Sequence, residues 1–175
     1  MPNYRKVVRD AARAALADEV AGFFATLQGL SAGYGVSEDV LAQFQIDFNP
    51  GSNNFFQGFL SPGDVGFSEL AEVPGLVLYT SAARNEGREK SRQFAGAVLL
   101  HIDAYLKFHD GVERDDTEAV ADAVEDALVS VVNAIHWPAG VSYNREYSVD
   151  RGSLQLLSDG WWQRVPLTAA CGVYI

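Results

Sequence analysis

The chain contains one group of residues whose types and spacing suit metal or acid–base chemistry: His101, Asp103, His109 and Asp110. His101 and Asp103 are two residues apart in a segment with strand-like alternation, so both side chains would lie on one face and could chelate one ion. No Glu or Cys completes a recognisable ligand set. Polar residues at alternate positions are also what a solvent-facing or interface-facing strand requires. We therefore interpret the pair as strand patterning and predict no catalytic, metal-binding or cofactor-binding residue.

The elements that position these residues predict an α+β fold in one domain, residues 1–175. The expected order is helix, two strands, helix, three strands. The helices are expected at Tyr4–Leu27 and about Asp116–Ile135, and the strands at Gly75–Ser81, Phe94–Phe108, Val141–Val149, Leu154–Leu157 and Trp161–Ile175. We expect a mostly antiparallel sheet of about five strands with both helices packed on one face, plus a long irregular insertion at residues 28–75.

Both expected helices carry an apolar stripe of three- and four-residue spacing. In the first helix, which Asn3 can cap, the stripe is Val8, Ala12, Leu16, Val20, Phe23 and Leu27. In the second helix it is Val120, Val124, Leu128, Val131 and Ile135. Asp115 is the expected cap of the second helix, and Glu118 is placed to complete a capping box.

Two of the expected strands are long and have a clear apolar face. The core face of residues 94–108 is expected to hold Phe94, Val98, Leu100, Ile102, Leu106 and Phe108, with a bend or bulge at Gly96. The core face of the last strand is expected to hold Val165, Leu167, Ala169, Cys171, Val173 and Ile175. Pro166 predicts an edge or a bulge, because it cannot donate to a ladder. Trp161 is expected to anchor the core, and Trp162 to be a surface or interface aromatic.

Composition excludes several classes of function. The net charge is −10 and the pI is about 4.6, which argues against nonspecific binding to nucleic acid or anionic membranes. No apolar run approaches the ~20 residues that span a bilayer, so no membrane partner is expected. The single cysteine, Cys171, rules out an intramolecular disulfide and suits a reducing compartment.

Two charged stripes are the strongest candidates for an interface. Arg5, Arg9 and Arg13 recur every four residues on the first helix, where like charges repel. The second helix carries the complementary acidic stripe of Asp115, Glu118, Asp122 and Glu125. We hypothesise that the stripes meet, either within one monomer or between neighbouring subunits. Two separate solvated surfaces are the alternative.

Further interface candidates lie in two connections. The 28–75 insertion holds Phe55, Phe56 and Phe59, which could contact a neighbour or a partner protein. The connection after the first strand, residues 84–92, is locally basic and includes Arg84 and Arg88. An ordinary solvated hairpin loop is the default interpretation of that connection.

The element order and the final segment resemble the tail terminator, or tail-completion, proteins of long-tailed bacteriophages. The resemblance is carried by FAGAVLLHIDAYLKF (94–108), DDTEAVADAVEDALVSVV (115–132), the Tyr-rich strand 141–149 and DGWWQRVPLTAACGVYI (159–175). The resemblance covers about the last hundred residues, and the N-terminal helix in a general way. The 28–75 region departs from a compact family member, which leaves open a terminator proper or a related neck protein.

The resemblance implies a structural virion protein without catalytic residues or cofactors. Such proteins form a homo-oligomeric ring, typically a hexamer, which ends the tail tube and joins it to the head connector and neck proteins. DNA would pass through the lumen without specific binding. The protein would be found in the virion tail or neck, and in the host cytoplasm during assembly.

Two alternatives belong to other classes of function. One is a small metal-dependent or acid–base enzyme that uses His101, Asp103 and His109. The other is a non-viral adaptor that pairs through its sheet edge or its Phe-rich loop. The enzyme should bind metal, and the adaptor should form a defined dimer or heteromer and no ring.

Overall fold

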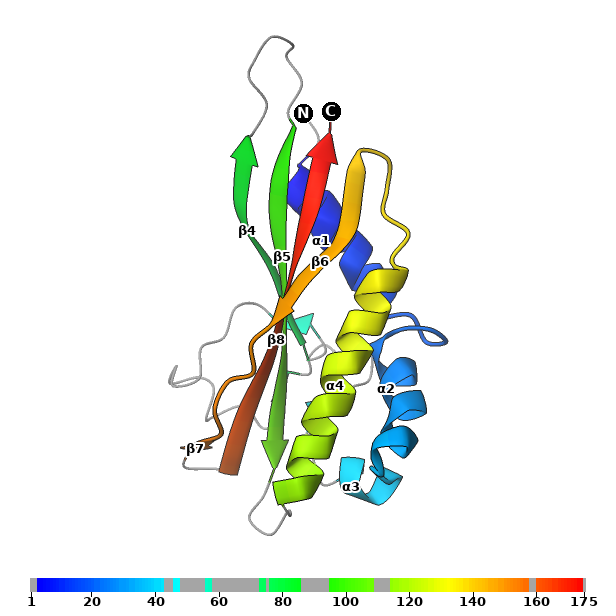
Figure 1. The fold of residues 1–175 in the computed structure, drawn as a ribbon, viewed down its shortest axis with the longest axis vertical. Coiled ribbons are helices and arrows are strands. Elements are labelled where there is room, and N and C mark those ends of the chain that lie inside the picture. The colour runs from blue at the N-terminus through cyan, green and yellow to red at the C-terminus, as the bar shows by residue number, and fades with distance from the viewer. Residues whose placement is uncertain are drawn as a thin grey trace.

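A mostly antiparallel sheet forms the centre of the protein, as the sequence predicts (Figure 1). The computed structural model describes residues 3–42, 46–47, 56–57, 73–74, 76–85, 95–108, 114–157 and 160–174. The long strands lie in the order β4 (Leu76–Asn85), β5 (Ala95–Phe108), β8 (Gly160–Tyr174) and β6 (Val141–Val149). The short strands are β7 (Gln155–Leu157), antiparallel to β8, and β2 (Phe56–Gln57), parallel to β4. A separate parallel pair joins β1 (Ile46–Asp47) and β3 (Val73–Pro74).

The helices cover one face of this sheet and enclose the main core. They are α1 (Tyr4–Leu16), α2 (Phe23–Ser31), the short 3₁₀ helix η1 (Ala32–Tyr34), α3 (Glu38–Ala42) and α4 (Arg114–Ala134). Figure 1 shows α2 alongside α4, with the sheet to one side of both. The predicted apolar faces are confirmed for the described residues: Val98, Leu100, Ile102, Leu106 and Phe108 of β5 and Val165, Leu167, Ala169, Cys171 and Val173 of β8 are all buried here. Phe94 and Ile175, also predicted on these faces, lie outside the described residues. The α+β fold therefore follows from two long alternating strands that share one apolar face.

The single first helix predicted at Tyr4–Leu27 is wrong, because the chain breaks it into α1 and α2. Asp18 Oδ1 accepts hydrogen bonds from the backbone N–H groups of Val20 and Ala21, at 2.9 and 2.8 Å. A Cβ at Gly22 would lie 2.2 Å from the Asp18 carbonyl oxygen, so the close turn requires glycine. Val20, which the periodicity places in the core, is 88% exposed. Local side-chain-to-backbone bonds thus compete successfully with the helical period.

The long second helix begins slightly earlier than predicted. α4 starts at Arg114, so Asp115 lies inside its first turn and does not cap it. The predicted stripe is confirmed, with Val120, Val124, Leu128, Val131 and Ile135 all buried in the main core. Asp115 and Asp116 still suit the positive end of the helix dipole.

The irregularities of the sheet lie on the outer strands. The bend predicted at Gly96 is wrong: β5 pairs with β8 without interruption from Ala95 to Phe108. The register of β4 against β5 shifts between Ser81 and Ala83 instead. β6 shifts against β8 between Tyr143 and Tyr147, where Arg145 has a φ of 61°. Bulges of this kind belong at edges, where they do not interrupt the central pairing.

Pro166 lies at a break in the outer pairing of β8, in agreement with the predicted edge. β6 ends at Val149 opposite Leu167, and β7 begins only opposite Trp162. Between them the connection stays close to β8, because Asp150 N–H donates to the Pro166 carbonyl and Gly152 N–H to the Arg164 carbonyl. β6, this connection and β7 together form one edge of the sheet.

Several boundaries differ modestly from the sequence prediction. β4 continues to Asn85, so Arg84 belongs to a strand and not to a loop. Within the 28–75 region, expected to be irregular, the chain forms the short elements α3 and β1. Among the described residues, no helix is long and apolar enough to cross a membrane.

Candidate functional site

The face of the sheet opposite the helices carries a polar and aromatic cluster, here called the second face. Its members come from three neighbouring strands, and it comprises Val77, Tyr79 and Ser81 of β4, Leu99, His101, Asp103, Tyr105 and Lys107 of β5, and Trp162, Arg164 and Thr168 of β8. Strand alternation sends these side chains away from the main core. Pairing of the strands places Tyr79 beside His101, and Tyr105 beside Arg164.

His101 is held by contacts to both of its ring nitrogens. Nε2 lies 2.5 Å from Ser81 Oγ, and Nδ1 lies 3.0 Å from Thr168 Oγ1. The ring stacks on Tyr79, with centroids 4.7 Å apart and planes 11° apart. Burial lowers the pKa of His101 and favours the neutral ring, against the opposing effect of Asp103. A histidine with both nitrogens engaged by hydroxyl groups is poorly placed to bind a metal ion.

Asp103 is the most deeply buried acid of the second face, with 1% of its area exposed. Its Oδ2 lies 2.8 Å from Arg164 Nη2, in an ion pair between neighbouring strands. The contact is close but poorly aligned, since neither Asp103 oxygen nor Arg164 Nε makes a well-directed hydrogen bond in the described part of the chain. Burial raises the pKa of Asp103, although the Arg164 guanidinium opposes the rise. The charged form of Asp103 thus depends on Arg164.

Trp162 belongs to a small second core, which corrects its assignment as a surface aromatic. It is 3% exposed and packs with Val77 and Tyr105. Trp161 lies on the other face, where it packs against the main core as expected. The Lys107 ammonium lies 5.2 Å from the centroid of the Trp162 ring. Burial raises the pKa of Tyr105 to about 12, so its phenol stays protonated.

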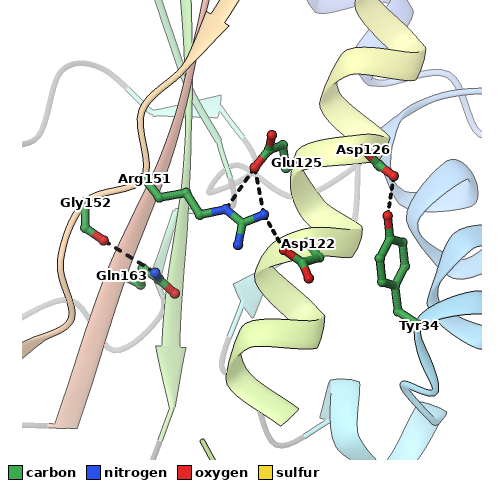
Figure 2. A network of polar contacts seen from close by, with 7 residues as sticks. All are labelled: Tyr34, Asp122, Glu125, Asp126, Arg151, Gly152 and Gln163. Atoms are coloured by element: carbon green, nitrogen blue, oxygen red, sulfur yellow. Dashed lines mark hydrogen bonds and ion pairs between the residues drawn. The ribbon is translucent and has the colours of Figure 1, made fainter. Parts of the chain in front are cut away.

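A pocket of about 310 Å³ opens at the edge of this cluster, where β6 has ended and β7 begins. Tyr105, Trp162 and Arg164 form its strand side. Gly152, Ser153 and Gln155 form its rim, from the connection and from β7. Gln163 also lines the pocket and donates from Nε2 to the Gly152 carbonyl oxygen at 3.4 Å (Figure 2). The size suits a small ligand or one inserted side chain.

Arg151 ties this rim to the helix layer, as Figure 2 shows. Its Nε donates to Glu125 Oε2 at 2.8 Å, and its Nη2 pairs with Asp122 and Glu125 of α4. On the opposite side of α4, the Tyr34 hydroxyl donates to Asp126 (Figure 2). Arg151 thereby anchors the start of the connection that forms the pocket rim to α4.

Part of each predicted charge stripe contacts residues other than the opposite stripe. Asp122 and Glu125 bind Arg151, while Arg9 donates to Thr80 Oγ1 at 2.8 Å. The intramolecular form of that hypothesis is therefore wrong for these residues, because Arg151 occupies the acidic side chains. Arg5, Arg13 and Asp115 are exposed, as is Glu118, so a contact between subunits stays a prediction.

Several predicted residues cannot be assigned contacts. Phe55, Phe59, Arg88, His109 and Asp110 lie outside the described residues. Phe56 is in β2 and Arg84 in β4, and only their backbone positions are described. His109 therefore cannot be placed beside His101 and Asp103. Within the described part of the chain, no group of three or more His, Cys, Asp or Glu residues is arranged to hold a metal ion.

Sequence reasoning missed the two arginines that organise this region. Arg164 falls on the non-core face of the last strand, and Arg151 lies in the turn after β6. The available signal was a cation at an alternate position of a long strand, in a chain with 13 basic and 23 acidic residues. That signal could not name the partners, because the partners are decided by the register between strands that are distant in the sequence.

No protein-family model and no curated protein matches the chain.

Proposed function

We propose that this chain is a structural protein of a bacteriophage tail, whose copies associate head to tail into a ring. The ring would end the tail tube and join it to the head connector, with DNA passing through its lumen. Support comes from the resemblance of the last hundred residues to tail terminator proteins, and from the open edges of the sheet.

The observation that carries the proposal is the direction of the outer long strands. β4, β5, β8 and β6 alternate in direction, so β6 runs antiparallel to β4. If a second copy is related to the first by rotation about an axis parallel to the strands, its strands run in the same directions as those of the first copy. Its β4 edge could then pair with β6 in the antiparallel sense, and such heterologous contacts close into rings when the rotation permits.

Both edges needed for that contact are open in the described part of the chain. β2 pairs with β4 only at Leu76 and Val77, and no described strand pairs with the outer side of β4 beyond them. The side chains of residues 144–148 in β6 are all exposed, and Tyr147 is 46% exposed. An edge of this length presents unpaired backbone groups that a neighbouring chain can satisfy.

The enzyme alternative has less support from the same geometry. The ring nitrogens of His101 contact Ser81 and Thr168, and Asp103 is paired with Arg164. These contacts account for the polar cluster without a substrate. We therefore propose a structural role and not a catalytic one.

The proposal can be tested by analytical ultracentrifugation of the wild type and two matched variants. Tyr147→Glu places a charge on the β6 edge and should shift the ring toward monomer, because charged side chains oppose edge-to-edge pairing. Val20→Glu makes the same apolar-to-acidic change in the connection between α1 and α2, away from both edges, and should leave the ring intact. A discrete dimer in the wild type would favour the adaptor. Equal assembly of Tyr147→Glu and the wild type would exclude the β6 edge as the contact.

A further inference from the structure

The two outer long strands, β4 and β6, are open over the same height of the sheet (Figure 1). Through their partners on β5 and β8, Leu78 lies in one row with Val149, and Asn85 lies in one row with Val141. β2 covers the outer side of β4 at the two residues before Leu78, and β6 ends at Val149. Among the described residues, the open stretch of β4 therefore matches β6 from end to end.

The backbone groups that point out of the two edges also agree. Asp150 N–H donates to the Pro166 carbonyl oxygen, one residue beyond the end of β6. Because bonded and non-bonded residues alternate along an antiparallel ladder, Val149 and Tyr147 turn their N–H and C=O groups away from β8. The same alternation across β8 and β5 turns these groups outward on two residues of β4, Leu78 and Thr80. Donors and acceptors of the two edges thus lie in the same rows.

The irregularities of the two edges lie at the same height as well. β4 shifts its register between Ser81 and Ala83, and β6 shifts between Tyr143 and Tyr147. β5 and β8 place Ala83 in one row with Tyr143, and Thr80 in one row with Tyr147. Between these two rows, three residues of β6 would face two of β4, which is a bulge of one residue. A slip by two residues would misalign the two irregularities.

Opposite charges lie along the two edges on the helix-covered side. On the β4 side, α1 packs against the strand, and Arg9 donates to Thr80 Oγ1 at 2.8 Å. On the β6 side, the carboxylates of Asp122 and Glu125 share one arginine, Arg151. Contact between the β4 edge of one copy and the β6 edge of the next would bring the basic helix toward the acidic one. Complementary charges of this kind favour one partner and one orientation.

Tyr147 is the side chain of β6 that this contact would cover. It is 46% exposed, and its partner on β8 is the buried Ala169, so its ring lies on the helix-covered side. In the shared row it would lie beside Thr80 of the neighbouring copy, to which Arg9 of that copy is bonded. A guanidinium over a tyrosine ring is a favourable cation–π contact.

We propose that a second copy of this chain adds its β4 to β6 in one register, with Thr80 opposite Tyr147 and Leu78 opposite Val149. The pairing resumes beyond the two bulges, with Asn85 opposite Val141. This inference rests on the proposed ring, and it specifies how neighbouring subunits meet. A closed ring has no translation along its axis, so each row of one copy continues into the same row of the next when the axis runs along the strands.

The register can be tested with a disulfide between copies, in the variant Thr80→Cys with Tyr147→Cys. Residues opposite each other in a bonded antiparallel pair have Cα atoms about 5.5 Å apart, within the range of a disulfide. Burial raises the pKa of Cys171 to about 12, so the native thiol should stay inert. Mild oxidation should give a ladder of covalent oligomers up to the size of the ring on a non-reducing gel. Each single-cysteine variant should give no ladder.

Two matched pairs detect other registers. Thr80→Cys with Ser148→Cys moves one cysteine to the adjacent exposed position, on the opposite face of the sheet, and should not crosslink. Thr80→Cys with Val149→Cys reports a slip by two residues, since diagonal neighbours lie roughly 7–8 Å apart and beyond disulfide reach. Asn85→Cys with Val141→Cys should crosslink like the first pair, and it carries the test if the first variant fails to fold.

Native mass spectrometry of the reduced variants separates the register from the ring. A ring that crosslinks through Thr80→Cys with Val149→Cys would overturn the register and leave the ring standing. A ring that crosslinks through neither predicted pair would overturn the contact between β4 and β6. Covalent dimers from Tyr147→Cys alone would show that two β6 edges meet about a two-fold axis. That result, or a protein that forms no ring, would overturn both proposals.

Discussion

On the helix-covered face of the sheet, β5 and β8 present Leu100, Ile102 and Leu167, which are fully buried among other apolar side chains. On the second face, the neighbouring residues of the same strands are His101, Asp103 and Arg164, which depend on specific partners. One pair of strands therefore carries two different kinds of interior. The first kind tolerates many apolar residues, because burial is non-directional. The second requires particular residues in register.

The apolar helix-covered face stabilises the fold, whereas the polar contacts of the second face contribute less to its stability. A buried ion pair contributes little net stability, because desolvation offsets the attraction between the charges. The Asp103–Arg164 pair is therefore a poor explanation for the stability of the sheet. Its arginine also lines the pocket at the edge of the second face. The contrast can be sharpened by substitutions that compare the two faces directly.

The largest expected effect is on the helix-covered face. Leu100→Ala should lower the free energy of unfolding by about 2–5 kcal/mol, because it leaves a cavity in a fully buried site. Leu99→Ala, one residue earlier on the second face, makes the same change in a partly buried site and should cost clearly less. Urea unfolding monitored by circular dichroism measures both. Equal losses would remove the distinction between the two faces.

The second effect concerns the ion pair. Arg164→Met leaves Asp103 buried without its cation and should cost about 2 kcal/mol, below the usual loss for a broken buried pair. The loss is reduced because Arg164 is 39% exposed and Asp103 can take up a proton. The double variant Asp103→Leu with Arg164→Met should recover most of it, since both charges are gone. Failure to recover would show that the pair itself stabilises the sheet.

A smaller effect is expected where the edge of the sheet meets α4. Arg151→Met removes the ion pairs to Asp122 and Glu125 and should cost about 1 kcal/mol or less, because all three side chains are partly exposed. Arg145→Met, on the exposed part of β6, should change stability by less than about 0.5 kcal/mol. Thermal unfolding of both variants against the wild type provides the measurement. A larger loss in Arg145→Met than in Arg151→Met would contradict the assigned contacts.

The smallest effect is a pH dependence at His101. Burial lowers its folded-state pKa below the ordinary value of 6.5, so the unfolded chain binds the proton first. Stability should therefore fall as the pH drops below about 6.5 toward the folded-state pKa, and level off below it. Comparing Asp103→Asn with Asp103→Asn plus His101→Gln isolates this slope, because the raised pKa of Asp103 acts in the opposite direction. An unchanged slope in the double variant would exclude His101 as its source.

The sequence predicts the helix-covered face better than the second face, for physical reasons. Long alternating or helical patterns identify β5, α4, β6 and β8, because burying one apolar face leaves little freedom of register. The break between α1 and α2 is missed because Asp18 and Gly22 act through local backbone bonds that leave the apolar period intact. Contacts such as Asp103 with Arg164, or Arg151 with Glu125, join residues far apart in the chain.

Contacts between residues far apart in the chain also explain why the candidate site was only partly predicted. The position of His101 and Asp103 on one face was correct, but their partners Ser81, Thr168 and Arg164 depend on strand order and register. Trp162 was expected at the surface because the second face was expected to meet solvent or a partner. It is instead covered in a small core with Val77 and Tyr105.

The proposed function is tested most directly by native mass spectrometry of the wild-type protein over a concentration series, with negative-stain images of the largest species. A closed ring is the result that the strand directions and the β6 edge, open among the described residues, lead us to expect, and the resemblance implies a hexamer. A protein that stays monomeric or dimeric at every concentration, and also when purified tail tubes are added, would contradict the ring.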